Sequence, residues 1–153
     1  MNSFFIDQPA YELVSPEELL KEALPTGPRS TVVVWESRPE TSQDLIPFLH
    51  KVFEALSVQL EREVFLLALP PGRHLGLLVL LRQLQARRVI VFGISPQRLG
   101  LAVEPGKYAL FRLGMRQYLW ADDLQAIREE RAAGGKTMSG PLWKALQTMF
   151  KER

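Results

Sequence analysis

The feature that most constrains the fold of this chain is a regular alternation of short apolar runs with longer helical segments. The three runs are Thr31–Trp35, Val64–Ala68 and Arg88–Phe92. Runs of this length, rich in Val, Ile, Leu and Phe, are typical of strands that are buried on both faces of a sheet. The order strand, helix, strand, helix, strand predicts a parallel sheet with right-handed crossover connections.

The two connecting segments have the spacing of amphipathic helices. In the first, Thr41 or Ser42 can cap a helix whose apolar residues recur from Leu45 to Leu56, and Pro47 is tolerable only in its first turn. The second segment, Arg73–Ala86, is so rich in leucine that we expect a well-buried helix.

The last third of the chain adds strand and helix signals. The runs Lys107–Leu113 and Met115–Leu119 predict one further strand, or a short hairpin about Gly114, and Pro141–Phe150 predicts a terminal helix. We therefore expect an α/β fold, a three-layer α/β/α sandwich with a mostly parallel central sheet of about four strands.

The N-terminal residues are expected to form an arm. Residues 1–13 carry an apolar cluster, Phe4, Phe5 and Ile6. The sequence Ser15-Pro16 and the acidic residues after it predict the start of a helix, which should end before Pro25. Residues 14–153 have the length of one α/β domain. No secretory signal or membrane-spanning run is expected, so we place the chain in the cytoplasm.

The charge is distributed unevenly although the net charge is only +2. Residues 1–86 carry 7 positive and 11 negative side chains, net −4, whereas residues 87–153 carry 12 and 6, net +6. Basic halves can bind nucleic-acid phosphates. The candidate DNA-facing residues are Arg87, Arg88, Arg112 and Arg116. Because they are scattered in the sequence without interleaved aromatic residues, an ordinary solvated surface is the favoured interpretation.

Catalytic patterns are sparse. In a parallel sheet, ligands bind beyond the carboxyl ends of the strands, where Glu36 is the one well-placed carboxylate. The two histidines, His50 mid-helix and His74 at the start of a buried helix, lack metal-ligand spacing, and the chain has no cysteine. We expect no catalytic residues, no metal and no cofactor.

Two further motifs have structural explanations. Gly134-Gly135-Lys136-Thr137 matches only the end of a phosphate-binding loop and is better explained as a solvated turn between helices. Asp122 and Asp123 are expected to cap a helix that begins with Leu124, rather than to bind a metal.

The closing segment resembles the tail of uracil-DNA glycosylases. Leu119–Leu124, Lys136 and Leu142–Leu146 correspond to a family segment in which His-Pro-Ser opens a helix and a Lys and a Trp-x-x-Leu helix follow. This chain has Ala121-Asp122-Asp123 in place of His-Pro-Ser, and Glu36-Ser37-Arg38-Pro39 in place of the family's Gly-rich motif. Both departures remove groups that cleavage of a flipped uracil requires.

The chain also resembles the psi subunits of bacterial DNA polymerase III, clamp-loader accessory proteins that are inactive relatives of the same fold. The likeness covers about residues 30–150 in layout, with an apolar arm ahead of the domain. It implies a sheet that docks a chi subunit or an analogue, and an arm around Phe4, Phe5 and Ile6 that inserts into the ATPase subunits. The alternative for these three residues is packing on the chain's own core.

Two hypotheses follow. The first is a non-catalytic interaction subunit of the DNA replication or repair machinery, with a protein partner and no membrane. The second is a nucleic-acid-binding or enzymatic member of the glycosylase-like fold, with Glu36 as its candidate polar group. The strand ends favour binding over catalysis because Pro, Gly, Ser and Leu predominate there.

Overall fold

A computed structural model describes residues 12–14, 31–37 and 42–151. The expected helix after Ser15 and the cluster Phe4, Phe5 and Ile6 lie outside these ranges. Within the described part of the chain, no helix is both long and apolar enough to cross a membrane.

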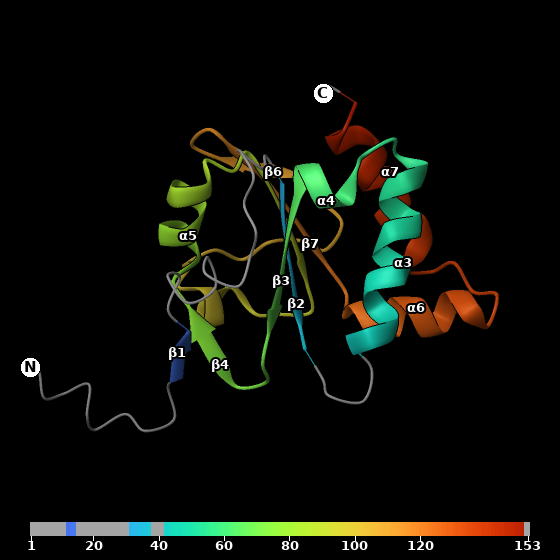
Figure 1. Cartoon of the computed structure of the whole chain (residues 1–153), viewed down its shortest axis with the longest axis horizontal. Coiled ribbons are helices and arrows are strands. Elements are labelled where there is room, and N and C mark those ends of the chain that lie inside the picture. The colour runs from blue at the N-terminus through green and yellow to red at the C-terminus, as the bar shows by residue number, and fades with distance from the viewer. Residues whose placement is uncertain (1–11, 15–30, 38–41, 152–153) are drawn as a thin grey trace, which may run out of the picture.

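The centre of the fold is a five-stranded sheet in the order β3-β2-β5-β7-β6 (Figure 1). The strands are β2 (Thr31–Glu36), β3 (Val64–Leu69), β5 (Arg88–Phe92), β6 (Phe111–Leu113) and β7 (Arg116–Ala121). The first four in this spatial order are parallel, and β6 lies antiparallel to β7 at the edge. The α/β class and the mostly parallel sheet are thus as expected. The fifth strand comes from a hairpin at Gly114, whose φ is +64°.

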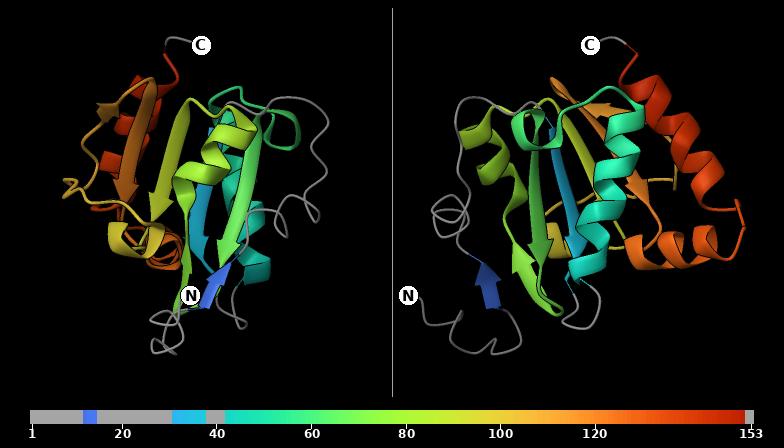
Figure 2. Two further views of the ribbon diagram at one scale, coloured as in Figure 1. Left: turned by 90° about the vertical axis from the view of Figure 1, so that its left-hand side faces the viewer. Right: turned by 45° about the vertical axis from the view of Figure 1, so that its right-hand side comes forward.

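Two apolar cores lie on the two faces of the sheet. Helix α5 (Leu77–Leu84) covers one face, and α3 (Ser42–Ala55), α6 (Leu124–Ala132) and α7 (Ser139–Met149) cover the other, as the two views in Figure 2 show. Alternate residues of β2 divide between the cores: Val32 and Val34 face α5, and Val33 and Trp35 face the three helices. This alternation explains why β2 is apolar throughout.

The segment expected as one helix over Arg73–Ala86 is instead a strand followed by a shorter helix. Arg73–Leu75 forms β4, which pairs in parallel with β1 (Glu12–Val14), and α5 begins at Leu77. The expectation failed because the hydrogen bonds of β4 go to a segment about sixty residues away, which local periodicity does not reveal. The last residues of the expected arm, Glu12 and Leu13, belong to β1.

The first crossover helix, α3, contains Pro47 beyond its first turn, where we expected it not to be tolerated. Proline removes one helical hydrogen bond. The helix continues because Leu45, Leu49 and Phe53 are buried against the sheet, and burial of this stripe outweighs the loss. A four-residue helix, α4 (Leu60–Glu63), then leads directly into β3.

The chain ends in two helices joined by a short turn. Helix α6 begins as expected, with the Asp123 side chain accepting a hydrogen bond from the Ala126 N–H at 3.2 Å. Helix α7 begins two residues earlier than expected, at Ser139. The segment from Gly134 to Thr137 is a turn between these helices, as expected, and no strand precedes it.

Candidate functional site

The carboxyl ends of β2 and β5 meet where the order of the parallel strands reverses, which is the usual ligand crevice of such a sheet. Glu36 lies there, as the sequence predicts. Its Oε2 atom accepts a hydrogen bond from Nη1 of Arg98 at 2.5 Å, and both side chains are 18% exposed. The expected polar group is therefore engaged in an ion pair.

Arg98 also ties neighbouring loops together at this point. It follows β5 in a short 3-10 helix, Pro96–Leu99. Its Nε donates to the Arg73 carbonyl and its Nη2 to the Pro70 carbonyl, each at 3.1 Å. One guanidinium thus joins the ends of β2 and β3 to β4. Its hydrogen bonds to the protein lie where the polar groups of a ligand would bind in such a sheet.

The two aspartates after β7 have different roles. Asp123 caps α6, as predicted, whereas Asp122 is not part of the cap. Its carboxylate accepts hydrogen bonds from Lys107 Nζ at 2.6 Å and from the Tyr108 hydroxyl at 2.7 Å. The bond from Lys107, and then that from Tyr108, hold the pKa of Asp122 below its usual value. Burial, and then the bond to Asp122, raise the pKa of Tyr108.

Neither histidine lies in a metal-binding cluster. His50 is half-buried on α3, and His74 lies in β4 rather than at the start of a helix. Among the described residues, no three side chains of His, Cys, Asp and Glu are grouped so that they could hold a metal ion.

The four arginines proposed to face DNA are scattered in the sequence but come together in space. Arg88 and Arg112 both pair with Gln117 in neighbouring strands, Arg87 precedes β5, and Arg116 begins β7. All four therefore lie at one end of the sheet. The pairing of β5, β7 and β6 brings them together, and sequence spacing does not show it.

Two of these arginines are held by the protein itself. Arg88 donates to the Met149 carbonyl at 3.4 Å and lies 4.9 Å from the centre of the Phe150 ring. Arg116 donates to the Ala86 carbonyl at 3.1 Å. Arg87 and Arg112 are exposed. The described geometry thus leaves these two as the arginines most accessible to a charged partner.

A hollow lies on the face of the sheet that α3, α6 and α7 cover, between these three helices. Its volume is about 730 Å³. Helices α3 and α7 meet near their C-terminal ends, where Phe53 and Phe150 form an edge-to-face contact with centroids 5.9 Å apart. Towards their N-terminal ends they diverge, and α6 crosses the space between them (Figure 2, right). We call this hollow the three-helix groove.

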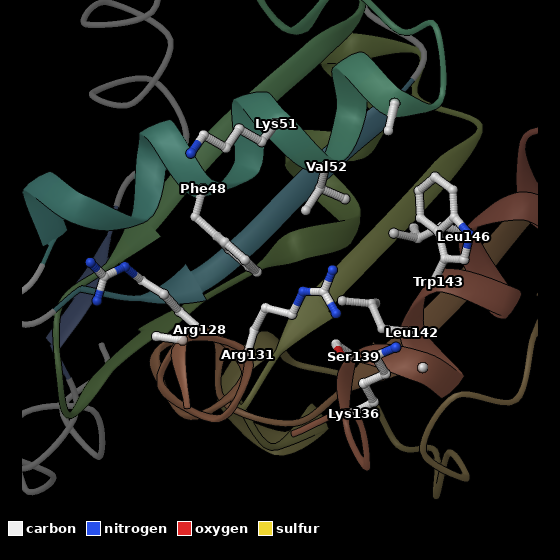
Figure 3. A pocket seen from close by; sticks show the side chains of 13 residues that line it. Phe48, Lys51, Val52, Arg128, Arg131, Lys136, Ser139, Leu142, Trp143 and Leu146 are labelled. Carbon is white, nitrogen blue, oxygen red and sulfur yellow. The ribbon is translucent and has the colours of Figure 1, made fainter. Parts of the chain in front are cut away.

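The floor and walls of the three-helix groove are apolar. The large apolar side chains that line it are Phe48, Val52, Leu142, Trp143 and Leu146. In Figure 3, Phe48 and Val52 point from α3 towards the space that Leu142 and Leu146 border from α7. Leu142 and Leu146 are buried, whereas Trp143 is partly exposed to solvent. The groove therefore exposes apolar surface that its own helices do not cover.

Cationic side chains surround this apolar surface. They are Lys51 from α3, Arg128 and Arg131 from α6, and Lys136 from the turn before α7. None of the described lining residues carries a carboxylate. Lys51, Arg131 and Lys136 are exposed and form no ion pair with any residue in the described ranges. The groove is thus apolar inside and positively charged at its rim.

A single carboxylate fixes the turn that carries Lys136. The Glu130 carboxylate accepts hydrogen bonds from the Thr137 hydroxyl and from the Met138 N–H, the latter at 2.8 Å. These two bonds, the first being the larger effect, lower the pKa of Glu130. The Gly134-Gly135-Lys136-Thr137 segment therefore positions one wall of the groove.

Sequence reasoning did not identify this groove. Its residues come from three separate segments, and those on α3 and α7 follow the same apolar periodicity as core residues. One sequence signal could have indicated the groove. Helix α6 has basic residues at positions 128 and 131, which share a helical face, and the next helix along the chain carries Trp143 among apolar residues. Only the packing of the helices shows that these residues border one hollow.

Comparison of the sequence with models of protein families gives no match, and comparison with curated protein sequences gives none either.

Proposed function

We propose that this chain is a non-catalytic protein-interaction subunit and that the three-helix groove is its principal docking surface. The observation that carries the proposal is the apolar lining of the groove, which the described helices leave partly exposed beside cationic side chains. Exposed apolar surface rimmed by polar residues is characteristic of interaction sites. The partly exposed Trp143 is the kind of side chain that dominates small interfaces.

The finer proposal places the chain in the cytoplasmic DNA replication or repair machinery, as a psi-like clamp-loader accessory protein on a uracil-DNA-glycosylase-like fold. Its support is the sequence resemblance, together with a mostly parallel sheet that ends in a short helix, a polar turn and a Leu-Trp helix. The cluster Phe4, Phe5 and Ile6, which lies outside the described residues, is the proposed second partner-binding element.

The proposal that the chain is not an enzyme is supported by the crevice at the strand ends. There Arg98 forms an ion pair with Glu36, and its Nε and Nη2 atoms donate hydrogen bonds to backbone carbonyls. An active site needs polar groups that are available to a substrate. The three-helix groove, by contrast, is lined by hydrocarbon and cations, which suits binding rather than acid–base chemistry.

The test is affinity capture from a bacterial extract, followed by mass spectrometry. The baits are the full chain, a variant with Phe4, Phe5 and Ile6 changed to Ser, and an Ala55→Trp variant that fills the groove. We expect replication or repair subunits with the full chain and their loss with at least one variant. Recovery of nucleic acid alone, equally by all three baits and sensitive to salt, would refute the proposal.

A second candidate function is direct binding of nucleic acid at the arginine-bearing end of the sheet. It is favoured by the convergence of Arg87, Arg88, Arg112 and Arg116 there. If this end binds phosphates, replacing the exposed Arg87 and Arg112 by Gln should weaken DNA binding and reduce its salt dependence. Filter binding or anisotropy with a labelled oligonucleotide measures both quantities.

A further inference from the structure

We propose that the three-helix groove binds an acidic amphipathic helix, with the apolar face of that helix on Phe48, Val52 and Trp143 and its carboxylates towards Lys51, Arg131 and Lys136. This inference rests on the proposed protein-binding function and specifies the chemistry of the partner.

Charge complementarity selects an acidic partner. The described lining contains four cationic residues and no anionic one. Lys51, Arg131 and Lys136 form no ion pair within the described part of the chain, so a partner's carboxylates would not have to displace an existing acid. A basic partner would meet like charges at the rim, which disfavours it strongly.

The positions of the cations favour a peptide with several carboxylates over a ligand with a single anionic group. Lys51 extends from α3, Arg131 from α6 and Lys136 from the following turn. In Figure 3 the charged end of Lys51 lies beside α3, apart from those of Arg131 and Lys136, which lie nearer to one another. One phosphate or one fatty-acid carboxylate could engage at most part of this set. Acidic residues spaced along a peptide could engage all of it.

The secondary structure of the groove walls favours a helical partner over a partner in an extended conformation. Most of the described lining comes from three α-helices and the rest from the turn before α7, and none of it belongs to a strand. The groove therefore offers no strand edge to which a peptide could add. Recognition must use side chains, and an amphipathic helix presents an apolar stripe with flanking charges for this purpose.

The experiment is selection of a phage-displayed library of random peptides of about 16 residues, long enough to form a helix, on the immobilised full chain. Enriched peptides are then measured by fluorescence anisotropy on three proteins. The groove triple variant is Lys51→Glu, Arg131→Glu and Lys136→Glu. Its matched control makes the same change of charge elsewhere: Arg87→Glu, Arg112→Glu and Lys144→Glu. The third protein is Ala55→Trp. Circular dichroism verifies that each variant is folded.

We expect enriched peptides with Asp and Glu beside apolar residues at i, i+3, i+4 and i+7. The groove triple variant and Ala55→Trp should each lower their affinity by about tenfold or more, whereas the control triple should change it by less than about twofold. Binding should also weaken as salt rises.

Three outcomes would overturn the inference. The first is that the enriched peptides are neutral or basic. The second is that they bind the groove variants with the same affinity as the unchanged protein. The third is that no peptide is enriched and calorimetry shows that dodecanoate binds the groove. The last outcome would assign the groove to a small anionic amphiphile. If extract capture still recovers a protein in any of these cases, the protein-binding function stands and only the acidic-helix partner is wrong.

Discussion

Arg98 shows how one side chain can link several loops at the end of a sheet. Its three donors reach Glu36 and two backbone carbonyls at the end of the sheet where ligands usually bind. Arg98 consequently joins the ends of β2 and β3 to β4. A sequence-based interpretation can place Glu36 there, but it has no means of identifying an arginine sixty-two positions away as its partner.

We predict that Arg98→Met lowers the free energy of unfolding by about 1–3 kcal/mol, because a partly buried carboxylate and two carbonyls lose their donor. Arg98→Lys should recover only part of this, since an ammonium cannot reproduce the planar arrangement of donors. Urea unfolding measures both values. Arg112→Met, at an exposed position, is the control, and an effect of Arg98→Met no larger than that of the control would contradict the role assigned to Arg98.

A second residue-scale prediction concerns Gly93, which follows β5. Its φ is +67°, and a Cβ at this position would lie 2.7 Å from the Cα of Asp123, the cap of α6. Gly93→Ala should therefore cost more than about 3 kcal/mol, from backbone strain together with displacement of the helix start.

Gly72 provides the matched control for Gly93. Its φ is +77°, but a Cβ there would meet no atom within 4 Å. Gly72→Ala should cost only the backbone term, about 1–2 kcal/mol. Equal losses of unfolding free energy at the two positions would show that close packing between Gly93 and Asp123 is not important for stability.

At the scale of elements, the connection between α6 and α7 depends on Glu130. Its pKa is lowered in the folded protein, so its stabilising contribution is fully present above its unfolded value, about 4.3, and is lost as pH falls through the folded value. We predict that the unchanged protein loses more stability between pH 7 and pH 3 than Glu130→Gln does. The pH dependence of the urea midpoint tests this. Identical pH profiles would contradict it.

The elements also show where local patterns mislead. The apolar run after Arg73 has the composition of a helix from its first residue, yet Arg73–Leu75 is a strand because it pairs with β1. Similarly, Pro47 is compatible with α3 because the buried stripe of that helix outweighs one missing hydrogen bond. In both cases tertiary interactions override a local preference.

For the whole molecule, the two cores share one sheet and should unfold as one unit. We predict that Leu80→Ala, in the core under α5, and Leu49→Ala, in the core under α3, each lower the unfolding free energy by about 2–5 kcal/mol, because both side chains are fully buried. In each variant, tryptophan fluorescence and circular dichroism should report one transition. Separate transitions for the two probes would show that residues 42–151 do not form a single domain.

The sequence by itself determined the α/β class, the first three strands of the sheet and the Asp123 cap, and it indicated the hairpin at Gly114 as one of two alternatives. Each of these depends on local physics: continuous apolar runs fit strands buried on both faces, glycine accepts a positive φ, and aspartate accepts a bond from the first turn of a helix. A reader of the sequence alone could therefore place the sheet and the position of Glu36.

Tertiary structure alone decided which side chains come together on the surface of the sheet and its helices. Strand pairing brought Arg88 and Arg112 together, and Arg98 formed an ion pair with Glu36. The divergence of α3 from α7 left a groove with Trp143 and cationic side chains at its edge. These features join residues that are distant in the chain. Local periodicity constrains which face of an element is apolar, but only packing decides whether that face is covered or remains exposed for a partner.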